Sequence, residues 1–473
     1  MTSAGGGHAT ALPKSATGAP KTSTPRIGHY RWVICALLFA ATGLNYVDRQ
    51  TIAFLKPVFS AQYGWDQADY AHIVQWFMIA YTVGYVIFGR IIDKIGAKLG
   101  YAIAVVIWTV AHLSCAILGI LPPALMLTSF MVTQALLGLG QSGNFPAALK
   151  AVAEWFPQRE RSLANGIFNA GSNVGAIVTP LVVPVVTLVF GWKWAFVATG
   201  ALSVFWLILW IWIYQKPSEH KKVSKAELDY IESDNPPPVK QLPWLKVMRV
   251  KETWAYALGK ALTDPVWFFY LFWLPDFFKQ TFPNKFGSTV SWLPAWVTAH
   301  AQYDAKLMIG VAAPVIVIYL ISDVGSVAGG WMSTAMIEAG FTVNRARKLT
   351  MLLCALCVLP VAFATMIFHD LWITTFVIGI AAAAHQAFSA NLITIPSDTF
   401  PKEAVGSVSG IGGTAGAFGG IIMTMGVAKA LKDMGGYSSV FFVAGLLYLV
   451  GLLVVHVLTP RLEMAKIGGI TLD

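Results

Sequence analysis

The amino-acid sequence predicts an all-α integral membrane protein of about twelve spanning helices, arranged as two six-helix bundles around a central cavity. Composition is the first observation: 56% of the 473 residues are hydrophobic and only 12% are charged, and the mean hydropathy of +0.63 is unlike that of a soluble domain. The second is the recurrence of apolar runs of about 20 residues, the length that crosses roughly 30 Å of hydrocarbon. The third is an internal repeat that relates the two halves of the chain.

The expected helices follow from the apolar segments in chain order. Polar or charged residues separate each segment from the next, so each stretch between them is expected to cross the bilayer. The first half predicts helices at residues 31–58, 70–92, 99–120, 123–150, 160–187 and 191–214. The second half predicts helices at residues 253–281, 308–337, 348–368, 371–397, 404–431 and 437–458.

Lys and Arg residues mark alternate connections, and such residues accumulate in cytoplasmic loops. They precede the first span and follow the second, fourth and eighth: Lys14, Lys21, Arg26 and Arg31, then Lys94 and Lys98, Arg159 and Arg161, and Arg345, Arg347 and Lys348. Both termini are therefore expected in the cytoplasm. The net charge of +10 then records orientation and does not indicate nucleic-acid binding. Trp292 and Trp296 fall in an expected external loop, where tryptophan anchors at the membrane interface.

Composition also divides the chain into domains. Residues 1–28 are rich in small residues, Pro and Lys and lack the apolar core of a signal peptide, which predicts a disordered cytoplasmic tail. Residues 29–214 form the first expected bundle and residues 251–460 the second. The charged, proline-containing residues 215–250 predict a cytoplasmic linker, and residues 461–473 a cytoplasmic tail.

The internal repeat is clearest where the fourth and tenth segments end. Glu154–Arg159 and the glycines after it recur as Asp398–Glu403 and its glycines, at one constant offset: Gly166 and Gly175, then Gly410 and Gly419. The same register sets Gln141-Ser142 opposite His385-Gln386, and polar residues at matching depth in both halves indicate a central cavity. Small residues four apart predict close helix approach, for moving interfaces or for static packing: Gly171 and Gly175, then Gly412, Gly416 and Gly420.

The first span carries an acid and a base, Asp48 and Arg49, into hydrocarbon. One ionised side chain at a helix centre costs roughly 2.5–3.5 kcal/mol, so the pair indicates a solute or proton pathway. Adjacent helix residues point about a hundred degrees apart, so the two are not expected to be permanent partners. The planar fork of Arg49 suits a carboxylate. Asp48 is expected to take up a proton when it is desolvated, and the alternative is a structural ion pair with a basic group on another helix.

Other polar residues within the spans are candidates either for substrate contact or for structure. Lys260 and Asp264 lie one turn apart and can pair with each other, and Pro265 would loosen the helix beside them, as a gating element needs. His385 is expected to be a neutral hydrogen-bonding group rather than a proton relay. Four amides have the same two interpretations: Gln386, Asn391, Asn144 and Asn173. Asp93, at the cytoplasmic end of the second span, is expected to be a conformational latch.

An enzyme within the membrane is the alternative from another class. The sequence has no paired-histidine metal motif, no nucleophile beside a base at diagnostic spacing and no cofactor fingerprint. The cysteines all fall within expected spans, where packing is the default: Cys35, Cys115, Cys354 and Cys357. Neither a metal nor a cofactor is expected.

Several motifs together resemble a known family. Residues 89–98 (Gly-Arg-Ile-Ile-Asp-Lys-Ile-Gly-Ala-Lys) resemble the loop signature of the major facilitator superfamily, although the counterpart around residues 330–348 is degenerate. Six segments resemble the anion:cation symporter family and its hexuronate transporter branch: Asn45–Arg49, Gly143–Pro146, Glu154–Pro157, Phe168–Asn173, Gly259–Trp267 and His385–Asn391. The resemblance covers residues from about 30 to 460.

The resemblance implies a major facilitator fold and import of a sugar acid, a hexuronate or a related aldonate, across the inner (plasma) membrane by proton symport with alternating access. The proton is the coupling ion, no other cofactor is implied, and a monomer is expected. Asp48 would be protonated, Arg49 would bind the carboxylate, and Tyr46 and Tyr81 would contact the sugar. Independently of the resemblance, Lys260 is a candidate for substrate contact because it lies at the start of a helix expected to line the cavity.

The chain departs from the family in the fourth span. The family commonly carries an Arg there and a Glu seven residues later, whereas this chain has Gln134 and Gln141, which neither titrate nor supply a full charge. Either protons couple through Asp48 alone, or Gln141 is an engineered mimic of a protonated Glu. A uniporter of an organic anion is the further alternative.

Overall fold

The computed structural model describes residues 28–233, 244–283, 285, 305–367, 369–400 and 402–465. Within these residues all regular structure is helical. The expected N-terminal tail up to residue 27, the end of the C-terminal tail and the tryptophans Trp292 and Trp296 lie outside the described residues.

The first half of the chain forms the expected spans with two local differences. Its helices are α1 (Tyr30–Tyr63), α2 (Gln67–Ile117), α3 (Pro123–Gln141), α4 (Asn144–Trp155), α5 (Gln158–Phe190) and α6 (Trp192–Ile213). α2 contains the second and third expected spans, joined through a kink at Gly96, whose φ of 83° is a conformation that residues with a Cβ rarely adopt. The fourth expected span is divided into α3 and α4 by a turn at residues 142–143.

The second half repeats this plan. Its helices are α9 (Lys251–Thr281), α11 (Ala305–Glu338), α12 (Val343–Val358), α13 (Val361–Ile367), α14 (Leu371–Thr399), α15 (Lys402–Asp433) and α16 (Tyr437–Leu458). The ninth expected span is divided into α12 and α13 at Pro360, which cannot donate a helical hydrogen bond. Eleven of the described segments are long and apolar enough to cross a membrane. α9 corresponds to the seventh expected span and is not among these eleven. Its 31 residues are long enough, but its charged residues lower its hydropathy.

The repeat is visible in the helix ends and in the helix pairs. α4 and α14 both end in an extended residue, Phe156 and Phe400. Gly175 of α5 lies against the backbone of α1, where a Cβ would approach the Gly43 carbonyl to 2.3 Å, and Gly419 of α15 lies against α9, where a Cβ would approach the Ala261 carbonyl to 2.3 Å. The close approach predicted for Gly175 is therefore confirmed in the first half. In the second half the predicted Gly412 and Gly416 face side chains of α9, and the close backbone contact is at Gly419 instead.

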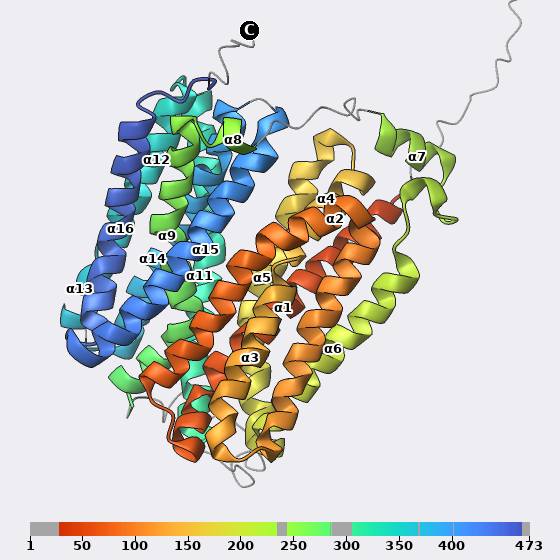
Figure 1. Cartoon of the computed structure of the whole chain (residues 1–473). Helices are drawn as coiled ribbons and strands as arrows, with labels where there is room; N and C mark the ends of the chain where they lie inside the picture. The colour runs from red at the N-terminus through yellow and green to blue at the C-terminus, as the bar shows by residue number, and fades with distance from the viewer. Residues whose placement is uncertain are drawn as a thin grey trace, which may run out of the picture.

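The two sets of helices lie side by side as two bundles (Figure 1). They meet through α2 and α15, α5 and α11, and α1 and α9. We call the face at the top of Figure 1, which carries α7, α8 and the end of α16, the termini face, and the other end of the bundles the opposite face. α1 begins at the termini face, since Arg31 bonds to Glu227 of α7.

The linker contains helices of its own: residues Pro217–Glu219, α7 (Lys225–Glu232) and α8 (Trp244–Val247). α7 is fastened to the first bundle by Arg31, whose Nε donates to Glu160 at 2.9 Å and whose backbone N–H donates to Glu227 at 3.1 Å. Tyr230 also donates to Glu160, at 2.8 Å. The expected linker is thus partly a structured cap on the first bundle.

Candidate functional site

Arg49 lies at the centre of a cluster of aromatic and amide side chains. Its Nε donates to Oε1 of Gln141 at 3.0 Å, and one terminal nitrogen donates to Oδ1 of Asn45 at 3.0 Å. Gln141 in turn donates to the Asn45 carbonyl at 2.9 Å. The guanidinium carbon lies over three rings, of Tyr46, Phe77 and Tyr81, at 4.9, 5.3 and 4.7 Å.

The charge of Arg49 is not neutralised by any carboxylate among the described residues. The side chain is only 2% exposed, and a buried charge is stable only when it is paired or hydrogen-bonded. Two of the five guanidinium N–H groups bond to the amides, and the aromatic faces supply cation–π attraction. The remaining N–H groups leave a fork that an incoming carboxylate could occupy.

Tyr46 connects this cluster to the second bundle. Its side chain lies beside Trp267 of α9 and Ser172 of α5, and close enough to Lys260 to interact with its charge. Lys260 forms an ion pair with Asp264 at 2.6 Å, as the one-turn spacing predicts. Asp264 packs against α15, where a Cβ on Gly416 would lie 2.3 Å from its Oδ2. Lys260 is therefore a compensated charge, unlike Arg49.

His385 lies on the other side of Trp267. The two rings stack with centroids 5.3 Å apart and an interplanar angle of 7°, and Nδ1 of His385 lies 2.6 Å from the Tyr448 hydroxyl. Trp267 also touches Tyr319 of α11, whose hydroxyl accepts a bond from Gln50 of α1 at 2.8 Å. The central cluster thus draws on helices of both bundles.

Three predicted site residues bond within their own bundle instead of joining this cluster. Gln134 points to Cys115 at 3.9 Å. Asn144 accepts from Tyr101 at 2.5 Å. Asn391 donates to the carbonyls of Gly329 and Ala387 at 3.0 and 2.9 Å. All three side chains are buried, and their partners are those of interior amides.

Two other predicted residues are half-buried and follow cluster residues along the chain. Asn173 is half-buried on α5 next to Ser172, and Gln386 is half-buried next to His385. The side chain of Asp93, the predicted latch, lies outside what the structure describes, although its backbone belongs to α2.

Asp48 faces away from the Arg49 cluster, into the interior of the first bundle. Its Oδ2 accepts a hydrogen bond from Ser203 of α6 at 2.9 Å, and its Oδ1 lies 3.2 Å from Nε2 of His112 in α2. The two neighbouring residues thus point to different partners, as their helical spacing predicts. The Asp48 carboxylate therefore faces an imidazole on another helix and not Arg49.

A second charged network joins the bundles near the opposite face. Nζ of Lys56, in α1, lies 2.7 Å from Oδ1 of Asp276, in α9, and both side chains are 4% exposed. Lys56 also lies over the rings of Tyr70 and Trp273. Asp276 accepts further bonds from the side chains of Gln67, Gln280 and Tyr437, and the Tyr70 hydroxyl donates to the Phe272 carbonyl at 2.8 Å.

Four further ionisable residues were not predicted as site residues from the sequence: Lys56, Asp276, His112 and Asp323, the last of these within α11. Each is an ionisable residue inside an expected span, so the rule that singled out Asp48 and Arg49 would have found them. What the sequence could not supply is the pairing, because Lys56 and Asp276 are 220 positions apart and meet only when α1 packs against α9.

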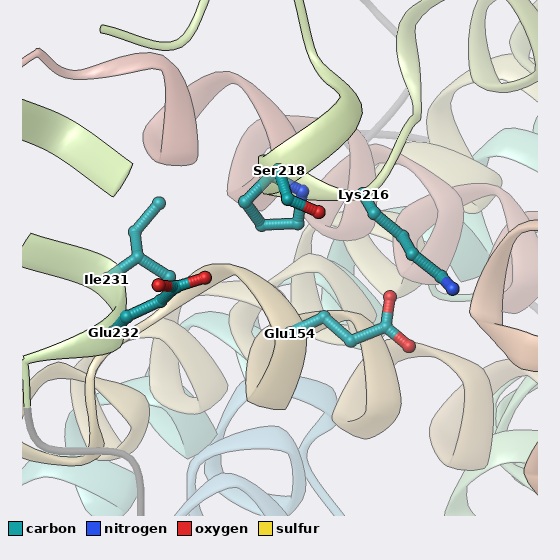
Figure 2. Close-up of a pocket in the computed structure, with 6 residues that line it drawn as sticks. Glu154, Lys216, Ser218, Ile231 and Glu232 are labelled. Carbon is teal, nitrogen blue, oxygen red and sulfur yellow. The ribbon is translucent and has the colours of Figure 1, made fainter. Parts of the chain in front are cut away.

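A pocket of about 190 Å³ opens at the termini face, away from all the predicted site residues (Figure 2). It is lined by Glu154, Lys216, Pro217, Ser218, Ile231 and Glu232. Tyr214 donates to Glu154 there at 2.7 Å. Burial and the Glu154 carboxylate raise the pKa of Tyr214 above its ordinary value, so this hydroxyl remains a donor at neutral pH. The pocket belongs to the contact between the first bundle and the linker.

Comparison with known proteins identifies the family. The family model described as Major Facilitator Superfamily matches residues 38–424 and 338–469. The chain belongs to the Major Facilitator Superfamily. It is therefore a multi-pass membrane transporter and not an enzyme.

Among its relatives, the "Hexuronate transporter" of Escherichia coli (strain K12) is 28% identical over 453 residues, which cover 93% of this chain and 97% of that protein. The "D-galactonate transporter" of Escherichia coli O6:H1 is 26% identical and covers 86% of this chain and 91% of its own length. The crystal structure of a D-xylose-proton symporter superposes with a TM-score of 0.68 at 14% identity, covering 94% of this chain and all of that one. This likeness confirms the predicted fold.

Proposed function

We propose that this transporter imports a sugar acid with one carboxylate, a hexuronate or a related aldonate, by proton symport. The observation that carries the proposal is Arg49, a buried cation with no carboxylate partner among the described residues, held by amides and aromatic rings. The names of the hexuronate and D-galactonate transporters among its relatives support the same class of substrate.

The charges around the centre favour a monoanion. Lys260 is compensated by Asp264, which leaves Arg49 as the uncompensated charge of the described cluster. A single carboxylate matches its fork, and a second anionic group would lack a counter-charge. Sugar hydroxyls can bond to the amides of Asn45 and Gln141, and the sugar ring can pack on the faces of Tyr46 and Tyr81.

Alternating access would expose this centre to each face in turn. The Lys56–Asp276 network ties α1 to α9 at the opposite face, which supports a state closed on that side. Tyr81 donates to Tyr85 at 3.3 Å over Arg49, so substrate entry requires these two side chains to part. We assign the opposite face to the outside and the termini face, with its basic connections, to the cytoplasm of a cell with an inner (plasma) membrane.

If the Lys56–Asp276 pair closes the outer face, Lys56→Met should open it. Removing one partner of a buried ion pair costs roughly 3–5 kcal/mol, because the other charge is left uncompensated. Hydrogen–deuterium exchange of residues 56–72 and 270–282 should therefore become faster. In the double variant Lys56→Met/Asp276→Asn neither charge remains. Its exchange rates should therefore lie between those of Lys56→Met and those of the unaltered protein.

Lys193→Met is the matched control for this experiment. Lys193 also lies near the opposite face, but its partners among the described residues belong to the first bundle: the Gly119 carbonyl at 3.3 Å and the ring of Trp192. Exchange rates in Lys56→Met equal to those of the control would exclude the pair as a closure of the outer face.

In the proposed cycle Gln141 behaves as a protonated, neutral Glu would at the same position. Its carbonyl oxygen accepts from Arg49 and its N–H donates to the Asn45 carbonyl, which are the bonds that a protonated Glu would make. An ionised Glu would pair with Arg49 and would repel the Asn45 carbonyl. The structure thus also favours a second candidate, a uniporter, in which this position does not titrate.

Gln141→Glu should therefore make transport more dependent on pH. At low pH the neutral Glu should behave as Gln does, whereas at high pH the ionised Glu should compete with the substrate carboxylate for Arg49 and slow uptake. Liposome uptake would be measured across pH, with and without an imposed gradient, in both proteins. Identical pH profiles would show that position 141 takes no part in coupling.

Uptake into proteoliposomes tests the proposed function directly. Labelled glucuronate, galacturonate and galactonate should accumulate when the lumen is alkaline, and neutral sugars and dicarboxylates should not compete. Entry that proceeds only down the substrate gradient, and that a pH gradient does not drive, would establish the uniporter instead. Chemical conversion of the solute would contradict transport. We further propose that the monomer is the working unit, since the central cluster is complete within one chain.

A further inference from the structure

Asp48 and His112 form a fully buried pair outside the central cluster. Both side chains have no exposed surface, and they belong to different helices, α1 and α2. Oδ1 of Asp48 lies 3.2 Å from Nε2 of His112. Two hydroxyls of α6 complete the group: Ser203 donates to Oδ2 of Asp48 at 2.9 Å, and Oγ1 of Thr199 lies 2.7 Å from Nε2 of His112.

The hydrogen bonds indicate where the protons lie. Thr199 donates its hydroxyl hydrogen to the Ala195 carbonyl at 2.9 Å, so its oxygen is left to accept the N–H of His112 Nε2. Nδ1 of His112 is buried and has no hydrogen-bond partner among the described residues. A proton there would be an unsatisfied buried donor, which is strongly unfavourable. His112 is therefore neutral in this state, with its proton on Nε2.

A neutral His112 leaves Asp48 without a counter-charge. Oδ1 of Asp48 is buried without a hydrogen-bond partner among the described residues, because the Nε2 proton points to Thr199. An ionised carboxylate with one hydroxyl donor in a dry interior is costly. The geometry therefore fits a protonated Asp48. When that proton leaves to water, the His112 N–H needs only to turn from Thr199 to Oδ1 to stabilise the carboxylate.

We propose that His112 is a positioning residue for the coupling proton, one that switches its Nε2 N–H between Thr199 when Asp48 is protonated and Asp48 when it is ionised. This inference rests on the proposed proton symport and adds the group that makes Asp48 able to release its proton. His112 keeps its own proton throughout, and the transported proton passes between Asp48 and water.

The other described side chains around Asp48 do not offer a second group for this role. α2 contributes one further titratable group near Asp48, the Cys115 thiol. Arg49, the next residue on α1, turns to Gln141 and Asn45. α3 supplies the neutral Gln134 beside Cys115, and α6 supplies the ring of Phe196 against His112. Among the described residues, no other ionisable side chain faces the pair.

Two substitutions should shift the pH profile of transport in opposite directions. His112→Leu removes the donor that supports the carboxylate, so Asp48 should hold its proton to higher pH. Release of the proton from Asp48 then limits net uptake, so uptake rises with pH and its half-maximum should move up by about one pH unit. Uptake at the original midpoint should fall about fivefold, from one half to roughly one eleventh of the maximum. Thr199→Val removes the hydroxyl that competes with Asp48 for the Nε2 N–H of His112. The ionised carboxylate is then better stabilised, so the pH of half-maximal uptake should fall.

Full-length variants in proteoliposomes provide the test, with initial uptake driven by a pH gradient and substrate counterflow measured across pH. His112→Gln keeps an N–H donor and should restore part of the profile. Thr109→Val, one turn away on α2 with a buried hydroxyl that has no described partner, is the packing control and should behave as the unaltered protein. If His112→Leu does not fold, the predicted fall in the pH of half-maximal uptake in Thr199→Val still tests the role of His112.

The measurements distinguish a failure of the proposed proton symport from a failure of the proposed role of His112. No uptake driven by a pH gradient in the unaltered protein would refute proton symport itself. Coupled uptake in the unaltered protein, with unchanged pH profiles in both His112→Leu and Thr199→Val, would overturn only the role of His112. Shifts of both variants in the same direction would also overturn it.

Discussion

Arg49→Lys should severely weaken the binding of sugar acids, although the positive charge is retained. The guanidinium spans Gln141 and Asn45 while its plane lies over three aromatic rings, and an ammonium can neither form the fork nor hold both amides. One hydrogen bond to a charged group contributes about 1.5–3 kcal/mol, so Kd should rise roughly 10- to 100-fold or more. The increase in melting temperature that substrate produces would measure the loss.

Arg90→Lys is the matched control for that variant. Arg90 lies exposed on α2, and the same change there should leave the substrate-induced thermal shift intact. Unaltered affinity in Arg49→Lys would refute a bidentate role for Arg49. Loss of affinity in the control would indicate a general effect of surface charge.

The sequence predicts the fold well because the bilayer restricts the choice of structure. Apolar length and charged connections define the spans, and the repeat of Trp155-Phe156-Pro157 as Thr399-Phe400-Pro401 aligns the halves. Breaks inside continuous apolar runs were not predicted. The break before Asn144 changes the backbone without changing hydropathy, so composition carries no signal for it. The Gly96 kink, by contrast, lies in the charged connection that was predicted between the second and third spans.

The sequence predicts those features of the site that depend only on the geometry of a single helix. The divergent directions of Asp48 and Arg49 and the Lys260–Asp264 pair both follow from the helical repeat. The sequence does not separate an amide that faces the centre from one that faces a neighbouring helix. Gln141 and Asn144 lie three residues apart, yet one bonds Arg49 and the other bonds Tyr101. Only the packing of α1, α2 and α3 distinguishes them.

Asp48→Asn should separate transport from its driving force. Asn is a neutral mimic of protonated Asp, and it can still accept the Ser203 hydrogen bond, so substrate binding and counterflow should persist. Accumulation driven by a pH gradient should be lost, because the variant carries no proton. One pH unit corresponds to about 1.4 kcal/mol, so a one-proton symporter should sustain roughly tenfold accumulation, and the variant none.

The second intramembrane acid makes this experiment discriminating. Asp323 is half-buried on α11, and its Oδ1 is buried with no hydrogen-bond partner among the described residues. Because Asp323 lies in the second bundle, away from the Asp48–His112 pair, Asp323→Asn should retain accumulation.

If instead Asp48→Asn accumulates substrate normally and Asp323→Asn does not, the proton is carried by the second bundle. Loss in both variants would mean that each acid is needed for coupling, whether for one proton or for two. The ratio of accumulation to imposed pH gradient distinguishes these outcomes, since each coupled proton multiplies the limiting accumulation by about ten per pH unit.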